Sequence, residues 1–287
     1  MDRVGDLGSR ACLVSLSLSQ WTARKLDKQA TQHVANHYGN ATSAGNYSKK
    51  LMPADAQSYL AIATAATEAR SYHYANTLPW KDDGARVLPA DNFMAYAEGM
   101  RSFRAKFEKA VAEFLYEYPR LVEESRVILN GLWKEQDFPS VSQLAKKFRF
   151  ETGTLPFPTA ADFRVDLAGG AADAVRAEIE RDVRRAAEEA MGDAWDRLRE
   201  ALGKMQERLA QPDAIFRDTL FDNLAELCDI LPRLNLLGDT RLDRMTADIK
   251  AKVLTCTPQE ARDDKPRRAA LAQEVENLGA LMDGFLQ

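Results

Sequence analysis

The sequence predicts a mainly α-helical protein, a multi-helix bundle with one long amphipathic helix and a minor two-stranded β element. Apolar residues recur at three- and four-residue spacing through long segments, which is typical of a helix with one buried face. Some of these segments begin at a capping box, as at Ser140 with Gln143 and at Thr257 with Glu260. Alternation of apolar and polar residues, which is typical of strands, is confined to two short stretches.

The two stretches with this alternation are residues 12–19 and 162–167. In the first, leucine and valine alternate with serine, and in the second, Phe163, Val165 and Leu167 stand between charged residues. A single strand would leave its backbone polar groups unpaired. We therefore expect the two strands to pair with each other and to form a small sheet on a helical body.

Helices are predicted at 23–38 and 54–74, followed by a long helix that Asp91 can cap. This helix carries a largely aromatic row at seven-residue spacing, which predicts that it is the central helix of the core. Pro119 is expected to break or kink it, because proline cannot donate the helical hydrogen bond. The row consists of Phe93, Met100, Phe107 and Phe114.

The longest predicted helix covers about 172–210 and follows a turn at Gly169 and Gly170. One face is apolar, and the other is crowded with arginine and glutamate at spacings that suit exposed ion pairs. Its length, on the order of 57 Å at about 1.5 Å per residue, exceeds what a compact domain of this size needs. We therefore expect it to cross both halves or to project toward a partner. Together with the aromatic row, the predicted core includes Trp195, Leu198, Leu224 and Leu278.

An irregular segment with prolines and glycine at 152–159 divides the chain near its middle. The predicted organisation is an N-terminal helical region at 1–151 with one strand, and a C-terminal helical region at 172–287 that packs on the first. The segment 152–171 is a linker with the second short strand. A single continuous domain is the alternative, because the length suits either one large domain or two modest ones.

Composition and charge restrict the class of protein. Hydrophobic residues make up 45% and charged residues 29% of the chain, which is ordinary for a globular protein. The formal net charge is −4, so a polyanion would have to meet a local basic patch. Cys12, Cys228 and Cys256 are too widely spaced for a disulfide framework or a paired metal motif. No signal peptide and no membrane span are recognisable, which predicts a cytoplasmic protein that does not bind membranes.

The most distinctive stretch is 70–89, where aromatic and cationic side chains surround a turn-rich loop. Unpaired bases stack on aromatic faces, and phosphates pair with cations, so this pattern is typical of single-strand binding. The alternative is an ordered loop in which Trp80 and Leu88 plug the core, and a loop this aromatic is more often packed than exposed. The candidate binding residues are Arg70, His73, Tyr74, Trp80, Lys81 and Arg86.

A second candidate binding segment is the loop 45–50, which carries Tyr47, Lys49 and Lys50. Its glycine, asparagine and serine predict a mobile loop, and cationic loops of this kind often contact anions. Solvated surface lysines are the alternative interpretation.

A metal site is the third candidate. His33 and His37 lie four residues apart on a predicted helix, which would place both rings on one face. Val34 stands where the helix of a zinc metalloprotease has glutamate, and His73 is the one remaining histidine. Histidines bonded to backbone or water are the preferred interpretation, and we predict no cofactor.

Four stretches of the chain carry a resemblance to known proteins: 77–89, Tyr118–Pro119, 162–165 and 231–235. With them the chain resembles a family of uncharacterised bacteriophage and prophage proteins of about this length. The resemblance covers most of the chain, and it implies a phage or prophage origin and an accessory role in DNA metabolism or host takeover. It implies no functional residue.

These observations predict a non-enzymatic accessory protein of a phage or prophage, located in the cytoplasm of the bacterial host. We expect it to act by self-association or by binding a phage or host protein through its long helix, and to contact nucleic acid at the two aromatic and basic loops. One alternative is a single-stranded DNA-binding recombination or replication factor. Another is a metal-dependent hydrolase that uses His33, His37 and His73.

Overall fold

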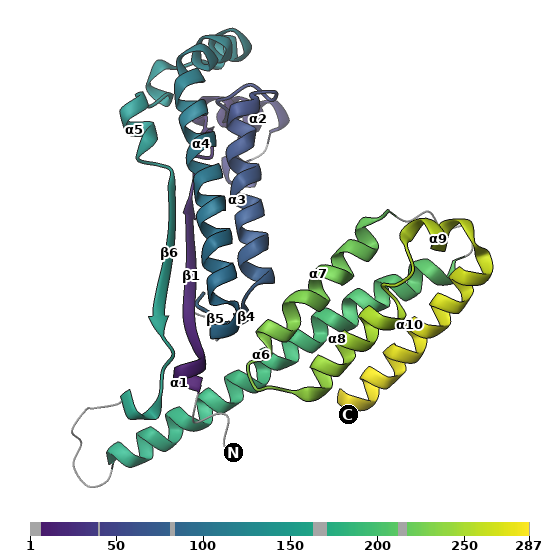
Figure 1. The fold of residues 1–287 in the computed structure, drawn as a ribbon. Coiled ribbons are helices and arrows are strands. Elements are labelled where there is room, and N and C mark those ends of the chain that lie inside the picture. Colours follow the sequence, from purple (N-terminus) through teal and green to yellow (C-terminus); the bar gives the residue numbers. More distant parts are fainter. Residues whose placement is uncertain (1–6, 40, 81–83, 163–170, 212–216, 287) are drawn as a thin grey trace. The chain divides into compact units, whose positions relative to one another are not determined.

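The structure is a computed structural model that describes residues 7–39, 41–80, 84–162, 171–211 and 217–286. Over the described residues it is 71% helical, with ten α-helices and a small amount of antiparallel sheet (Figure 1). The predicted mainly α-helical class is confirmed. No helix in the described part of the chain is both long enough and apolar enough to cross a membrane.

The β structure is larger than the predicted pair of strands. One sheet has four strands in the order β4-β5-β1-β6, and a second sheet joins β2 and β3. Within the larger sheet, β1 and β5 are antiparallel, with Ala11 opposite Pro89 and Val14 opposite Arg86. The strands are β1 (Ala11–Ser19), β2 (Arg24–Leu26), β3 (Ser48–Lys50), β4 (Leu78–Pro79), β5 (Arg86–Pro89) and β6 (Arg149–Pro156).

The partners of β1 are therefore not the predicted ones. Its neighbours in the sheet, β5 and β6, come from segments that the sequence analysis assigned to a loop and to the beginning of a linker. Asp162 ends a short 3-10 helix, Ala160–Asp162, and the remainder of the predicted second strand lies outside the described residues.

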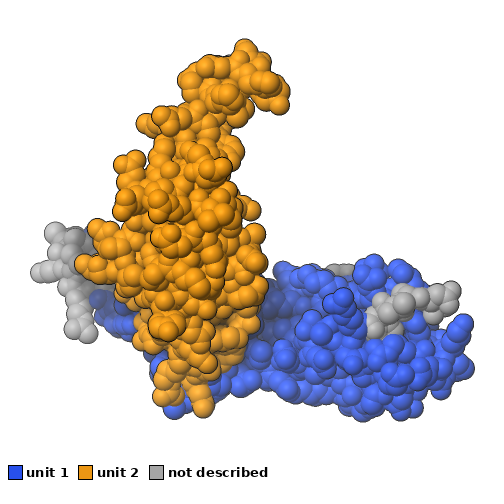
Figure 2. Space-filling model, turned by 90° about the horizontal axis from the view of Figure 1, so that it is seen from above, with its two compact units in different colours: residues 1–15, 73–97, 153–287 blue, residues 16–72, 98–152 orange. Residues whose placement is uncertain are grey.

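Clustering of backbone contacts divides the chain into two compact units, which Figure 2 shows in different colours. Unit 1 contains residues 1–15, 73–97 and 153–287, and unit 2 contains residues 16–72 and 98–152. The predicted organisation had two contiguous halves. In the structure, residues 1–15 and 73–97 group with residues 153–287.

Unit 1 is mainly a helical bundle, in which α6 packs against α7 and α10, and α7 against α8 (Figure 1). The long predicted helix is α6, and its apolar side chains from Val183 to Leu209 are buried. Trp195, Leu198, Leu224 and Leu278 are buried as predicted. Most of the apolar face of α6 is thus covered within the unit. The helices of this unit are α1 (Leu7–Arg10), α6 (Ala171–Ala210), α7 (Thr219–Leu234), α8 (Thr240–Lys252), α9 (Pro258–Asp263) and α10 (Lys265–Leu286).

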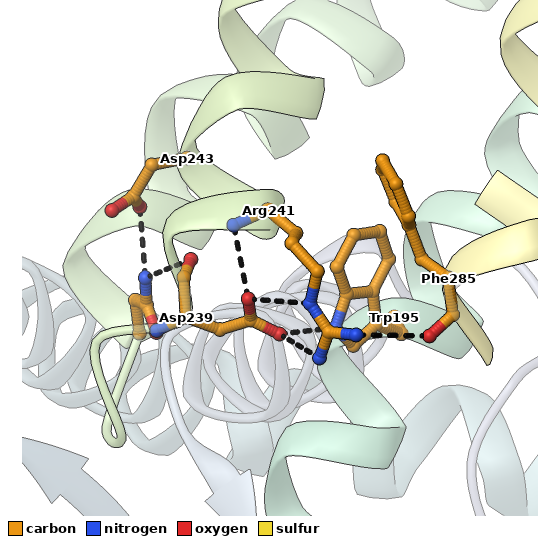
Figure 3. A network of polar contacts seen from close by, with 6 residues as sticks. Trp195, Asp239, Arg241, Asp243 and Phe285 are labelled. Atoms are coloured by element: carbon orange, nitrogen blue, oxygen red, sulfur yellow. Dashed lines mark hydrogen bonds and ion pairs between the residues drawn. The ribbon is translucent and has the colours of Figure 1, made fainter. Parts of the chain in front are cut away.

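A polar network ties three of these helices together (Figure 3). Asp239 caps α8 by accepting a hydrogen bond from the backbone N–H of Arg241, and it also accepts from Trp195 Nε1 at 3.3 Å. The guanidinium of Arg241 pairs with Asp239 at 2.9 Å and donates to the carbonyl oxygen of Phe285 at 3.1 Å. Because Trp195 belongs to α6 and Phe285 to α10, the network fixes the start of α8 between them.

The end of α6 is closed by a buried arginine from α10. Arg268 is 6% exposed and donates to the carbonyl oxygens of Arg208, Leu209 and Gln211. These carbonyls at the C-terminus of α6 lack hydrogen-bond partners within the helix, and the negative end of the helix dipole lies there. The guanidinium donates the missing hydrogen bonds, and its positive charge balances the dipole.

Unit 2 is built on α3 and α4, which lie side by side (Figure 1). We predicted that Pro119 breaks or kinks this helix, and the structure excludes the break, because α4 runs through Pro119. Phe114, Tyr118 and Leu121 are buried on either side, and the Tyr118 hydroxyl donates to the Pro139 carbonyl at 3.0 Å. This packing holds the helix together where proline lacks an N–H. The helices that lie in this unit or enter it are α2 (Lys28–Tyr38), α3 (Gln57–Ala75), α4 (Ala90–Leu129) and α5 (Val141–Ala145), with 3-10 helices at Thr42–Ala44, Asn130–Leu132 and Glu135–Asp137.

One predicted core residue of α4 is not in the core. Met100, Phe107 and Phe114 are buried as predicted, but Phe93 is 37% exposed. In the first turn the inward position belongs to Asn92, whose side-chain amide donates to the carbonyl oxygen of Asn76 at 2.9 Å. A polar residue is therefore buried there because it satisfies the backbone at the end of α3.

Candidate functional site: a groove with two arginines

The structure places the residues of the 70–89 stretch in different environments. Trp80 is 3% exposed and packs against Phe157, with 4.7 Å between ring centroids, as the core-plug alternative proposed. Arg70 is half-buried on α3, and Lys81 lies outside the described residues. Of this group, Tyr74 and Arg86 remain together at the surface.

The residues of the 45–50 segment are also placed in different environments, some exposed and one buried. Tyr47 and Lys50 are exposed, but Lys49 is 2% exposed, because the alternation of β3 turns it inward. Lys49 Nζ lies 3.2 Å from Asp27 and 2.7 Å from Asp137, so its charge is neutralised inside unit 2. The pKa of Asp27 is lowered by the N–H of Ala30 and by Lys49. Lys49 therefore holds the fold together and does not contribute to a surface patch.

The three histidines do not meet. His33 and His37 are exposed on α2 in unit 2, whereas His73 belongs to unit 1, where it is 3% exposed and its Nδ1 lies 2.8 Å from the Tyr96 hydroxyl. Among the described residues, no group of three or more histidine, cysteine, aspartate or glutamate side chains is arranged to hold a metal ion.

Tyr74 and Arg86 line a surface hollow of about 520 Å³ in unit 1, which we call the arginine groove. Its walls come from the end of α3, from β5, and from one face each of α6 and α7. On α7 the lining residues recur at three- and four-residue spacing, so they belong to a single helix face. The lining residues are Tyr74, Ala75, Arg86, Asp193, Arg197, Asn223, Glu226, Leu227 and Ile230.

The two arginines of the groove converge on the backbone at the end of α3. The carbonyl oxygen of Thr77 accepts from Arg86 Nη2 at 3.1 Å and from Arg197 Nη2 at 2.8 Å. Arg86 Nε also donates to Thr77 Oγ1 at 2.7 Å, and Arg197 Nη1 donates to the Ala75 carbonyl at 3.1 Å. Because Thr77 is fully buried, both guanidinium groups are fixed from behind and held at the groove wall.

The charges of the two arginines are balanced unequally. Arg197 forms an ion pair of 2.7 Å with Asp193, whereas no described carboxylate forms an ion pair with Arg86. Burial and the neighbouring charge of Arg197 lower the pKa of Arg86, and Asp193 partly offsets this effect. A guanidinium has five N–H donors, and the contacts to Thr77 occupy only two of its three nitrogens. Arg86 therefore combines a charge that has no ion-pair partner among the described residues with capacity for a further acceptor.

Aromatic and apolar groups complete the groove. The guanidinium carbon of Arg86 lies 4.8 Å from the centroid of the Tyr74 ring, which is a cation–π distance. Tyr74 is itself 55% exposed. Leu227 and Ile230 present partly buried aliphatic surface on the α7 side. The arrangement suits a ligand that carries an anionic group beside an apolar one.

His73 lies next to Tyr74 in the chain and responds to the charge of Arg86. Burial, and to a lesser extent Arg86, lower the pKa of His73 to about 4. The side chain is therefore neutral at neutral pH and adds no third cation behind the groove.

This shift predicts a pH dependence of stability. As the pH falls from about 6.5 to about 4, the unfolded chain binds a proton at this position, whereas the folded protein does not. The free energy of unfolding should therefore decrease by on the order of 3 kcal/mol across this interval because of His73. Urea unfolding at a series of pH values would measure the effect, and the His73→Gln variant should lose it.

The matched control is His37→Gln, which changes an exposed histidine and should retain the pH dependence of the wild type. If His73→Gln and the wild type lose stability in parallel between these pH values, His73 is not held neutral in the folded protein.

Two of the groove residues, Tyr74 and Arg86, were predicted from the sequence, whereas those of α6 and α7 were not. Asp193 and Arg197 stand four residues apart on a helix rich in similar ion pairs, so nothing in the sequence distinguishes them. The lining residues of α7 fall on one face of that helix, but a single sequence does not indicate which elements pack beside it. No family model, no curated protein and no solved structure matches the chain.

Proposed function

We propose that this protein is a non-enzymatic accessory protein of phage or prophage origin that binds another protein, and that the arginine groove receives an acidic segment of that partner. The observation that carries the proposal is Arg86. Its charge has no carboxylate partner among the described residues, it is rigidly held by Thr77, and it faces a groove with aromatic and aliphatic walls.

The chemistry of the groove favours a peptide. A carboxylate of the partner would accept charge-assisted hydrogen bonds from Arg86, which are among the stronger polar contacts in proteins. A neighbouring apolar side chain would cover Leu227 and Ile230. Tyr74 adds a large contact area with little loss of side-chain entropy, as aromatic residues do in interfaces.

A single-stranded nucleic acid fits the groove less well. Its phosphates would approach Asp193 and Glu226 as well as the arginines, and this mixed charge does not attract a polyanion. Trp80, the residue with the largest ring available for base stacking in the 70–89 stretch, is buried. Single-strand binding is therefore the rival outcome of the test below.

The test compares two labelled probes by fluorescence anisotropy: a peptide of alternating glutamate and leucine, and a single-stranded oligothymidylate. We expect the peptide to bind and the oligonucleotide not to bind. Arg86→Gln removes the charge, and we expect it to weaken the peptide about tenfold or more, since a hydrogen bond to a charged group contributes about 1.5–3 kcal/mol. Tyr74→Ala removes exposed contact area without touching Thr77 and should also weaken it.

Arg185→Gln is the matched control, because Arg185 is an exposed arginine of α6 that does not line the groove. It should bind the peptide like the wild type. Salt-sensitive binding of the oligonucleotide that Arg86→Gln abolishes would replace the proposal by its rival. Peptide binding that is the same in all variants, or absent in the wild type, would remove the groove as a protein-binding site.

A further inference from the structure

The exposed face of α4 in unit 2 carries an unusual row of side chains. Tyr116 is 90% exposed and Val127 is 80% exposed, which are the two highest values among the exposed large apolar residues of α4. They belong to a row at three- and four-residue spacing that runs along the outer face of the helix. This row, the Tyr116 stripe, consists of Ala105, Lys109, Ala112, Tyr116, Arg120, Glu123 and Val127, all of them exposed.

The stripe is complementary to itself when it is read in the opposite direction. Lys109 and Glu123 each lie seven residues from Tyr116, on opposite sides, and Ala105 and Val127 each lie eleven residues from it. An antiparallel second copy centred on Tyr116 would therefore place lysine opposite glutamate and alanine opposite valine, with the small Ala112 opposite Arg120 beside the axis. This is the pattern that a two-fold interface requires, because each residue then meets its counterpart twice.

The charges of the middle part of α4, residues 101–126, follow the same pattern. Residues 101–109 contain four cationic residues and one carboxylate, whereas residues 113–126 contain four carboxylates and two cationic residues. In an antiparallel pair the basic part of each helix faces the acidic part of the other. In a parallel pair like charges would face each other, which is unfavourable.

Arg120 of the stripe pairs closely with Glu124 of its own helix, but the other two charged residues, Lys109 and Glu123, are only loosely held. Lys109 lies 3.8 Å from Glu113, and Glu123 lies 3.9 Å from Arg126, with all four side chains more than half exposed. Exposed pairs of this kind contribute little to stability. Lys109 and Glu123 can therefore leave these ion pairs and bind a partner with little loss of stability.

We propose that two copies of this protein associate through an antiparallel pair of α4 helices, with the two-fold axis at Tyr116. The two Tyr116 side chains bury each other, and Lys109 of each copy pairs with Glu123 of the other. The surface lies entirely in unit 2, so the inference does not depend on the arginine groove, which lies in unit 1.

Charge reversal tests the pairing directly. The full chain is followed by light scattering after size-exclusion chromatography over a range of concentrations. We expect a dimer for the wild type, and at least a tenfold weaker dimer for Lys109→Glu and for Glu123→Lys, because each places like charges opposite each other. The double variant restores both contacts with reversed sign, and its dimer should recover. Lys146→Glu, an exposed change in unit 2 outside the stripe, should leave the dimer unaffected.

A cross-link tests the register. In Tyr116→Cys the two new thiols meet at the axis, within the distance of about 7 Å that a disulfide tolerates between Cα atoms. Oxidation should therefore give a covalent dimer that the wild type, with its own three cysteines, does not form.

Three results would overturn the proposal. A wild type that is monomeric at every concentration excludes self-association, and a dimer unchanged by both single reversals places the interface elsewhere. A double variant that stays as weak as the single ones excludes the pairing of Lys109 with Glu123. Circular dichroism of each variant shows whether the helix content is preserved, so that a loss of dimer is not a loss of fold.

Discussion

Replacement of Lys49 by methionine is expected to lower the free energy of unfolding by about 3–5 kcal/mol. Lys49 is 2% exposed and lies between the carboxylates of Asp27 and Asp137, and its ammonium also donates to the Leu132 carbonyl at 2.6 Å. Methionine has a similar length but no charge. The substitution would therefore leave two buried carboxylates with only the partly exposed Lys134, 3.8 Å from Asp27, as a nearby cation. Removing one partner in this way is the costly way to break a buried ion pair.

Lys50→Met is the control for this prediction, because Lys50 is the exposed neighbour of Lys49 on the same strand. It should change the free energy of unfolding by less than about 0.5 kcal/mol. Urea unfolding followed by tryptophan fluorescence is suitable, since Trp21 and Trp133 both lie in unit 2. Equal stabilities of the two variants would show that water reaches the Lys49 site.

The same network should make the protein sensitive to acid. The pKa of Asp27 is lowered by the N–H of Ala30 and by Lys49, so its carboxylate stabilises the folded state above the ordinary aspartate pKa. This contribution is lost as the pH falls through the lowered pKa. In Lys49→Met one of the causes of the lowered pKa is absent, and the loss should begin at a higher pH.

Local signals were sufficient to predict much of the helical structure. The predicted helix at 172–210 and the observed α6 differ by one residue, because its apolar face repeats without interruption. The capping boxes at Ser140 and Thr257 start α5 and α9 as predicted. Each of these signals depends on residues within a few positions of one another, which is the range over which a sequence can be read directly.

The sheet was not predictable in the same way. β5 has four residues and ends at Pro89, which is too short for a periodic pattern. β6 has a single buried residue, Phe150, and is otherwise exposed. Their identity as strands comes from pairing with β1, and such pairing depends on the tertiary structure more than on intrinsic preference.

The candidate site shows the same division between local and distant information. The aromatic and cationic composition of the 70–89 stretch indicated Tyr74 and Arg86 together with Trp80, and Trp80 is buried, as in the core-plug alternative. Arg197 reaches Thr77 across a separation of 120 residues. Contacts of this range are set by how the helices pack, and a single sequence does not indicate them.

The position of the core face on α4 leads to the last prediction. Phe107 is 2% exposed and contacts Phe150 with 5.8 Å between ring centroids, whereas Phe93 on the same helix is 37% exposed. Both were predicted to be buried from their seven-residue spacing. The structure separates them, because Asn92 takes the inward position in the first turn.

Phe107→Ala should therefore lower the free energy of unfolding by about 3–5 kcal/mol, the loss typical of removing a fully buried phenylalanine. Phe93→Ala makes the identical chemical change at a helical position that is not buried, and it should cost less than about 1 kcal/mol. Because the helix propensities of the exchanged residues are the same at both sites, the difference between the two variants measures burial alone. Urea unfolding of both variants measures these free energies. If the free energy of unfolding falls by less than about 1 kcal/mol in Phe107→Ala, or by the same amount in both variants, α4 presents a different face to the core.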